Sequence, residues 1–189
     1  MMSQQNKLDV KYSFQSLMPN ITKRIQQCIS DLINEHIIVK IKDIFKLKPE
    51  LSATLCRKEE TVIIYSYIVF DERYQGLIAL DINAAKRIVK LLLNMAEIDL
   101  TEDNALDALK EFGNIVFGSL ASEVSKKLNT KVNYSIPQVV VELCSAVISS
   151  LAAEMCTHND LIDVFKLEFI SKNESINMII LLFKEGVLC

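Results

Sequence analysis

Glycine, proline, histidine and tryptophan are scarce in this sequence, which has four, three, two and none of them, respectively. Because glycine and proline are so few, the chain is neither a flexible linker nor a low-complexity segment. Long apolar runs are also missing, since the most apolar stretch, residues 139–156, is interrupted by Glu142 and Glu154. A membrane-spanning helix needs about 20 residues with few or no charges, and residues 1–11 lack the apolar region of a secretory signal. We therefore expect a cytoplasmic protein without membrane insertion.

An excess of positive charge is absent as well. The 21 basic and 24 acidic residues give a formal net charge of −3, and no long block of one sign occurs. Binding to nucleic acid requires a strong basic surface. We therefore expect no nucleic-acid partner.

Motifs for metals and nucleotides are missing too. The five cysteines contain no C-x-x-C pair, and neither His36 nor His158 stands in an H-E-x-x-H array. No glycine-rich phosphate loop or G-x-S-x-G element occurs. We expect free, buried thiols in a reducing compartment, a loop at His158, and no metal site or cofactor on this chain.

The sequence does contain ample apolar material for a core. Half of its residues are hydrophobic, and a domain of this length buries roughly 70% of its unfolded surface. No shift in composition marks a linker. We expect a single domain over residues 1–189, with a loose segment at residues 1–12.

Hydrophobic periodicity divides the chain into helices and strands. Helices are expected over residues 16–34, 84–95 and 101–128, with Asn83 and Thr101 as N-caps and Asn129 as a stop. Strands are expected over residues 37–47, 61–70, 76–81, 132–141 (broken by Pro137), 161–170 and 175–184. Residues 71–75 are expected as a turn and residues 49–52 as a loop, and residues 143–156 stay ambiguous between helix and strand. These elements predict an α+β domain in which helices cover one face of an antiparallel sheet.

The helix expected over residues 101–128 carries the most informative pattern. On a wheel of 100° per residue, its core face gathers Leu106, Leu109, Gly113, Val116, Leu120 and Val124. The opposite face gathers Asp107, Glu111, Gly118 and Ser122, with Asn114 at its edge. Since Glu111 and Asn114 are three positions apart, their Cβ atoms are expected about 5–6 Å from each other.

Small and apolar residues on this outer face indicate a docking surface. Gly118 costs roughly 1 kcal/mol relative to alanine in a helix interior, and Ala121 lies near the same line, so another surface could come close. Ile115 is expected to point outward beside Glu111. Gly113 is expected to allow close packing against the sheet. The alternative is an ordinary solvated helix face, on which glutamate and asparagine at this spacing are common.

A carboxylate and an amide at this spacing suit one kind of chemistry. Hydrolysis of an aspartyl phosphate, an activated acyl phosphate, mainly needs a water molecule held in line with the phosphorus. An asparagine amide can orient that water, and a carboxylate can pair with a lysine of the partner and fix the docking register.

The sequence resembles a known family at these residues. The run Glu111-Phe-Gly-Asn114-Ile-Val-Phe-Gly118-Ser-Leu-Ala, followed by Val132-Asn-Tyr-Ser-Ile-Pro137-Gln-Val-Val, is similar to the CheC/CheX/FliY phosphatases of bacterial chemotaxis, and to CheX most of all. The resemblance extends over about residues 14–185, and its specific part is residues 105–141. In the first half of the chain, Leu17-Met18-Pro19-Asn20 stands where a second E-x-x-N element could occur, so one active centre is expected.

The resemblance implies a fold, an activity and a partner. The fold would be an antiparallel sheet packed against long helices and built from two pseudo-repeated halves. The substrate would be a phosphorylated CheY-type response regulator, whose own Mg²⁺ supplies the metal. Glu111 would pair with a lysine of the regulator, and Asn114 would position the attacking water. The resemblance also implies a homodimer that forms through the sheet edges. The outer face of the helical wheel, independently of the resemblance, gives the residues expected to contact the partner: Asp107, Ile115, Gly118, Ala121 and Ser122.

Two other functions stay open at this point. The chain could be a noncatalytic module that keeps the fold and docks a response regulator or another signalling protein. It could also be a sheet-paired dimer with a purely structural role, although an exposed Ile115 beside a glycine argues against that.

Overall fold

The computed structural model describes residues 14–55, 59–155, 161–172 and 174–185. The loose segment expected at residues 1–12 and the loop expected at His158 lie outside these ranges. No helix within them is both long enough and apolar enough to span a bilayer.

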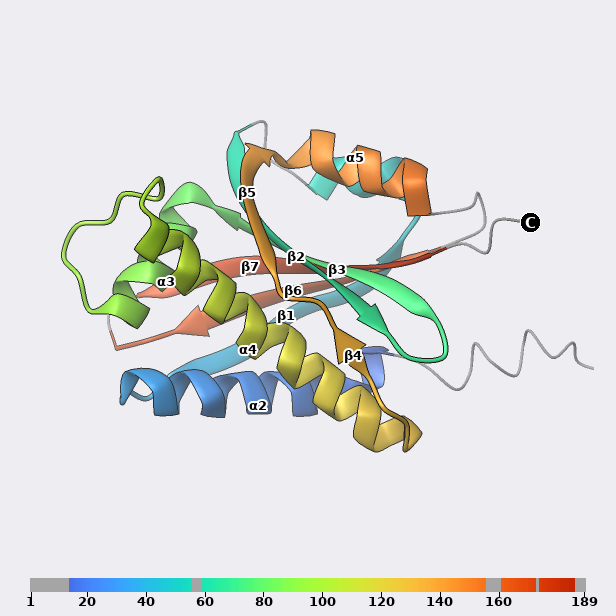
Figure 1. The fold of residues 1–189 in the computed structure, drawn as a ribbon, viewed down its shortest axis with the longest axis horizontal. Helices are drawn as coiled ribbons and strands as arrows, with labels where there is room; N and C mark the ends of the chain where they lie inside the picture. The colour runs from blue at the N-terminus through green and yellow to red at the C-terminus, as the bar shows by residue number, and fades with distance from the viewer. Residues whose placement is uncertain (1–13, 56–58, 156–160, 173, 186–189) are drawn as a thin grey trace, which may run out of the picture.

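Among the described residues, seven strands form one antiparallel sheet (Figure 1). Its order is β1-β6-β7-β3-β2-β4, and β5 also pairs with β2. The strands are β1 (Ile38–Leu47), β2 (Glu60–Val69), β3 (Arg73–Asp81), β4 (Asn133–Tyr134), β5 (Gln138–Leu143), β6 (Ile162–Ile170) and β7 (Ser175–Lys184). The expected strands are confirmed, except that β3 begins inside the segment expected as a turn. The break at Pro137 is confirmed as the gap between β4 and β5.

Three long helices cover one face of the sheet, as expected. They are α2 (Phe14–Ile33), α3 (Ile82–Leu93) and α4 (Asp103–Leu128). The ambiguous segment forms the helix α5 (Cys144–Met155), which packs with the 3-10 helix η1 (Pro49–Leu55) on the other face. Residues 49–52, expected as a loop, are thus part of η1.

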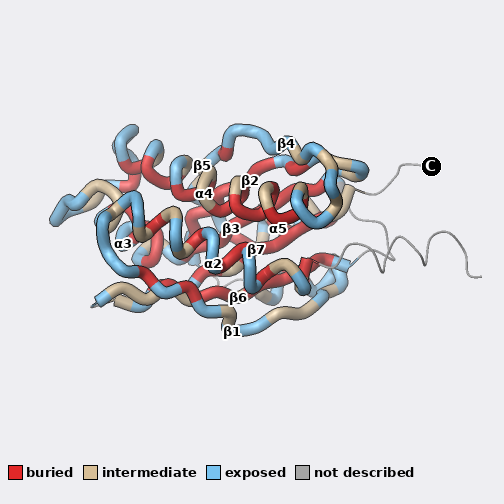
Figure 2. Tube along the Cα trace, turned by 90° about the horizontal axis from the view of Figure 1, so that it is seen from below, coloured by how far each residue is buried: buried red, intermediate tan, exposed pale blue. Residues whose placement is uncertain are grey.

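Alternation along the strands divides the core into two layers. Val62, Ile64 and Ile68 of β2 belong to the large cluster under the long helices, whereas Ile63 belongs to a smaller cluster with α5. Buried residues concentrate where helices meet the sheet (Figure 2). The sheet therefore has a buried core on both faces, under the long helices on one face and under α5 and η1 on the other.

Two expected helix caps are wrong. Asp81, not Asn83, caps α3, because its side chain at the end of β3 accepts a hydrogen bond from the Ala84 N–H at 2.7 Å. Thr101 does not cap α4, since Glu102 holds the N-cap position. The Thr101 N–H and hydroxyl instead donate to Asp99 in the preceding turn, and these bonds lower the pKa of the Asp99 carboxyl. The stop at Asn129 is confirmed, with left-handed φ and ψ of 51° and 42°.

The expectation of free thiols is only partly correct. Cys28 is free and half-buried, but Cys144, at the start of α5, is disulfide-bonded. A pattern of single, widely spaced cysteines gave no sign of this bond.

Two similar halves interlock in the sheet. The first half runs α2, β1, η1, β2 and β3, and the second runs α4, α5 and β6–β7 in the same order, with β5 (preceded by the two-residue β4) in the place of β1. The first strand of each half pairs with the other half, β1 with β6 and β5 with β2, while β3 and β7 meet at the centre. Helices α2 and α4 pack against each other across this centre. The expected pseudo-repeat is thus visible in the strand order.

Candidate functional site

Helix α4 is buried over more of its circumference than one core face would require. Besides the expected core positions, its buried residues include Phe112, Phe117, Ser119, Ala121 and Glu123. The reason is that α4 contacts α2 on one side, the sheet beneath it, and β4 and β5 on the other side. Only a narrow strip of the helix therefore stays exposed.

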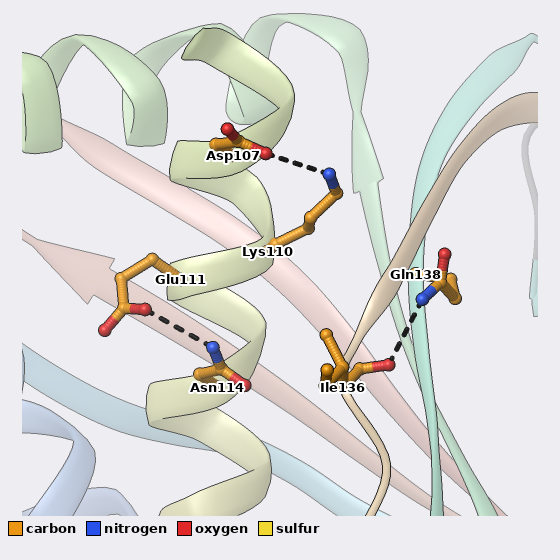
Figure 3. Close-up of polar contacts among 6 residues, drawn as sticks. All are labelled: Asp107, Lys110, Glu111, Asn114, Ile136 and Gln138. Atoms are coloured by element: carbon orange, nitrogen blue, oxygen red, sulfur yellow. Dashed lines mark hydrogen bonds and ion pairs between the residues drawn. The ribbon is translucent and has the colours of Figure 1, made fainter. Parts of the chain in front are cut away.

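Glu111 and Asn114 lie side by side on this strip (Figure 3). Glu111 is exposed and Asn114 is half-buried. The Asn114 amide Nδ2 donates to Glu111 Oε2 at 3.3 Å. Because both residues sit in the interior of a long, well-packed helix, their relative positions are fixed by the backbone. The pair thus presents one carboxylate and one amide together to a partner.

A second polar pair continues the strip one turn earlier. Lys110 Nζ lies 2.8 Å from Asp107 Oδ1, and the Asp107 side chain is 71% exposed. Of the residues expected to contact a partner, Asp107 therefore lies on the same surface as Glu111. The strip carries two carboxylates and one ammonium within about two turns of helix.

The other expected contact residues are placed differently. Ile115 is half-buried and packs against the large core cluster, and Ser122 is half-buried. Ala121 is 4% exposed, so the expectation that it lies on the outer face is wrong. A Cβ atom at Gly118 would lie 3.0 Å from the Tyr134 hydroxyl. The space beside Gly118 is thus occupied by this chain.

The predicted role of Gly113 is confirmed. A Cβ atom there would lie 2.7 Å from Ile64 Cγ2 and 3.0 Å from Pro137 Cβ. Only glycine allows α4 to approach the sheet and Pro137 this closely without displacement of a neighbour.

One feature beside the pair was missed by sequence reasoning. Residues 134–138, which we call the strap, link β4 to β5 and run alongside α4. Within the strap, Ile136 is 75% exposed and Tyr134 is 40% exposed. The only available signal was an isoleucine directly before the strand-breaking Pro137. No group of metal-binding side chains occurs in the part of the chain that the structure describes.

Comparison with known proteins connects these features to a family. A family model described as chemotaxis phosphatase CheX matches residues 64–154, from β2 through α4 and the strap to α5. No curated protein matches the sequence.

Solved structures share the fold. FliY of Thermotoga maritima superposes with a TM-score of 0.72 at 15% identity, over 85% of this chain and 83% of that chain. FliM in a FliM–SpeE complex from H. pylori gives 0.70 at 13% identity, over 90% and 85%. CheX from Desulfovibrio desulfuricans gives 0.60 at 13% identity, over 90% and 99%. The family model thus relates residues 64–154 to chemotaxis phosphatase CheX, and the solved structures show that the chain shares the fold of FliY, FliM and CheX.

Proposed function

We propose that this chain is a phosphatase that accelerates dephosphorylation of a phosphorylated CheY-type response regulator in chemotaxis signalling. The observation that carries the proposal is the hydrogen-bonded pair of Glu111 and Asn114 on the outer strip of α4, within the region that the chemotaxis phosphatase model matches. The pair is held by a helix that is packed on three sides.

In the reaction, a water oxygen attacks the phosphorus of the regulator's aspartyl phosphate. The bond from phosphorus to the aspartyl oxygen breaks, which leaves a free carboxylate on the regulator and releases inorganic phosphate. The Asn114 amide aligns this water, and alignment of reacting groups is worth several kcal/mol of barrier. The Mg²⁺ expected on the regulator would neutralise charge on the phosphoryl oxygens, and in this proposal the present chain supplies no metal.

Glu111 acts as the docking acid. In the free chain its carboxylate accepts the hydrogen bond from Asn114. When a lysine of the regulator pairs with Glu111, the amide of Asn114 is released toward the phosphoryl group. Charge pairing at an interface fixes register and orientation, which is what an aligned water requires.

The test is phosphate release from a phosphorylated CheY-type regulator, measured with the wild-type chain and with Asn114→Ala. We expect acceleration by the wild-type chain, and loss of it in the variant while affinity for the regulator is retained. No acceleration with any CheY-type regulator of the same cell would contradict the proposal.

A noncatalytic binding role is the second candidate. The shared fold allows it, because FliM, which superposes with a TM-score of 0.70, is solved in a complex with SpeE. Binding of a regulator without any effect on its phosphate would support this alternative.

We also propose that the chain forms a homodimer through the β5 edge of its sheet. Val141 and Leu143 on this edge are 40% and 47% exposed, whereas the opposite edge strand, β1, carries Lys40, Lys42 and Lys46. Charged edges resist strand pairing and apolar edges permit it. Light scattering should show a dimer that Val141→Lys dissociates, and a monomeric wild-type chain would contradict this arrangement.

A further inference from the structure

Ile136 is the most exposed large hydrophobic side chain in the described ranges, at 75%. Burying an isoleucine fully is worth about 1.5–3 kcal/mol, so this position forgoes most of that stabilisation. A single exposed apolar residue is ordinary on a protein surface. What distinguishes Ile136 is that its neighbours prevent it from turning inward.

The residue before Ile136 is fixed to the sheet. The Ser135 N–H donates to the Tyr67 carbonyl at 2.9 Å, and the Ser66 hydroxyl donates to the Ser135 carbonyl at 2.8 Å. The Tyr67 N–H donates to the Ser135 hydroxyl at 3.1 Å. Both the backbone and the side chain of Ser135 are therefore held against β2.

The residue after Ile136 is fixed to the helix. Pro137 is buried, and its Cβ lies 3.0 Å from the position that a Cβ atom of Gly113 would take. Side chains of an extended segment alternate between its two sides. Because the Ser135 hydroxyl is bonded to β2 and Pro137 is buried against α4, the side chain of Ile136 between them points outward. Its exposure is thus fixed by the fold and does not depend on a flexible loop.

Along the axis of α4, the strap lies at the same height as Glu111 and Asn114. Pro137 contacts α4 at Gly113, and the Tyr134 hydroxyl lies beside Gly118. These two glycines are five positions apart, or about 7.5 Å along the helix axis, and Asn114 falls between them. Figure 3 shows Ile136 next to the helix turn that carries Glu111 and Asn114. A partner that covers Asn114 therefore reaches Ile136.

We propose that Ile136, supported by Tyr134, is an apolar docking ridge for the response regulator that binds Glu111 and Asn114. This inference rests on the proposed function and adds a specificity contact to it. The matching surface on the regulator has a cation for Glu111 and an apolar depression beside its phosphorylation site. A polar pair that fixes register beside an apolar anchor is a common arrangement at protein interfaces.

The test is a binding measurement with a regulator activated by beryllofluoride, a stable mimic of the aspartyl phosphate. Ile136→Ser should raise the Kd about tenfold. In turnover it should raise KM by a similar factor and leave kcat within about twofold, since the residue does not touch the water. Leu51→Ser is the matched control, because Leu51 is 50% exposed on η1, across the sheet. It should change neither quantity.

The outcomes separate this inference from the proposed phosphatase. An unchanged Kd for Ile136→Ser would overturn the ridge even if phosphate release is fast. A tenfold higher Kd for Ile136→Ser would support the ridge even if the wild-type chain does not accelerate phosphate release from the regulator. A change in self-association of the variant, with no change in its Kd, would assign Ile136 to a contact between copies and overturn the proposal. A wild-type chain that binds no regulator would overturn both.

Discussion

Helices α2 and α4 occupy equivalent places in the two halves, yet only α4 carries the polar pair. Each helix ends at an asparagine in the left-handed conformation, Asn34 with φ of 52° and Asn129 with φ of 51°. Counted back from these residues, the buried Ile21, Ile25 and Ile29 of α2 correspond to Val116, Leu120 and Val124 of α4. The stripe that faces the sheet is therefore kept in both halves.

The outer positions differ between the two helices. By the same count, Ser16 and Pro19 of α2 stand where α4 has Glu111 and Asn114. The element Leu17-Met18-Pro19-Asn20, expected from the sequence as the degenerate counterpart, is thus shifted by one residue. With either alignment of the two helices, α2 lacks a glutamate at the position of Glu111, so only one candidate site is present. The difference teaches that the core stripe is common to both halves of the fold, while the outer strip of one helix carries the candidate site.

Depth of packing is the second difference. Met18, buried at 1% exposure, occupies the α2 position that corresponds to Gly113 of α4. The Met18 side chain fills the space beneath α2. At the equivalent place on α4, Gly113 has no side chain, and Pro137 packs against the helix there. This closer approach brings the strap beside Glu111 and Asn114.

Truncation on the α2 side should have the largest effect on stability. Met18→Ala removes a buried side chain and leaves a cavity, so we expect a loss of about 2–5 kcal/mol of unfolding free energy. Urea denaturation measures it. A loss below about 1 kcal/mol would mean that α2 moves into the cavity left by Met18. That result would contradict the claim that α4 packs more closely than α2.

Enlargement on the α4 side should have the next largest effect. Gly113→Ala places a Cβ atom 2.7 Å from Ile64 Cγ2 and 3.0 Å from Pro137 Cβ. Overpacking costs about 1–3 kcal/mol, against about 1 kcal/mol gained from helix propensity. We expect a lower melting temperature and, because Pro137 is displaced, weaker binding of the regulator. A more stable variant with unchanged binding would contradict the close approach.

An ion pair between the two halves predicts a smaller, pH-dependent effect. Lys46 Nζ of β1 lies 3.2 Å from Asp163 Oδ1 of β6 and donates to Oδ2 at 3.3 Å, so Oδ1 has a charge partner but no hydrogen bond. Burial raises the pKa of the Asp163 carboxyl above its usual value, although Lys46 acts in the opposite direction. The carboxyl therefore favours folding when protonated, and this contribution is lost as pH rises through the raised pKa.

Asp163→Asn should consequently stabilise the protein at neutral pH, by about 1 kcal/mol. Lys46 is 42% exposed and can remain solvated without its partner. The gain should shrink as pH falls toward the pKa of the carboxyl. Thermal melts of both proteins across this pH range provide the measurement, and a gain that grows on acidification would contradict the assigned cause.

The smallest effect is expected at Gly118. A Cβ atom there meets only the Tyr134 hydroxyl, at 3.0 Å, which is the far end of a side chain that can shift. Gly118→Ala should therefore stay within about 1 kcal/mol of the wild type, because helix propensity offsets the contact. A loss as large as that of Gly113→Ala would show that both glycines serve close packing.

Local signals in the sequence were enough for most elements. Asn129 was predicted as a helix stop because its left-handed conformation depends on its own backbone. The caps failed because Asp81 and Asp99 made the relevant hydrogen bonds from neighbouring elements. The segment at α5 was undecided because its packing partner, η1, is distant in the sequence.

The site was only partly predictable for a similar reason. Helical spacing predicted that Glu111 and Asn114 are neighbours, and the structure brings them together. Their assignment to a site came from the family resemblance and not from the spacing. The wheel assumed one core face, so it put Ala121 outside, whereas contacts on three sides of α4 bury it. Ile136 was missed because its exposure depends on Ser135 binding β2 and Pro137 packing on Gly113.

The central claim is that the outer strip of α4, and not that of α2, carries the chemistry. Phosphate release from a phosphorylated CheY-type regulator should be measured with Asn114→Ala and with Asn20→Ala, its matched control on the exposed face of α2. The account predicts that Asn114→Ala lowers the rate by about 100-fold or more and that Asn20→Ala leaves it unchanged. Equal rates for the wild type and Asn114→Ala would contradict it.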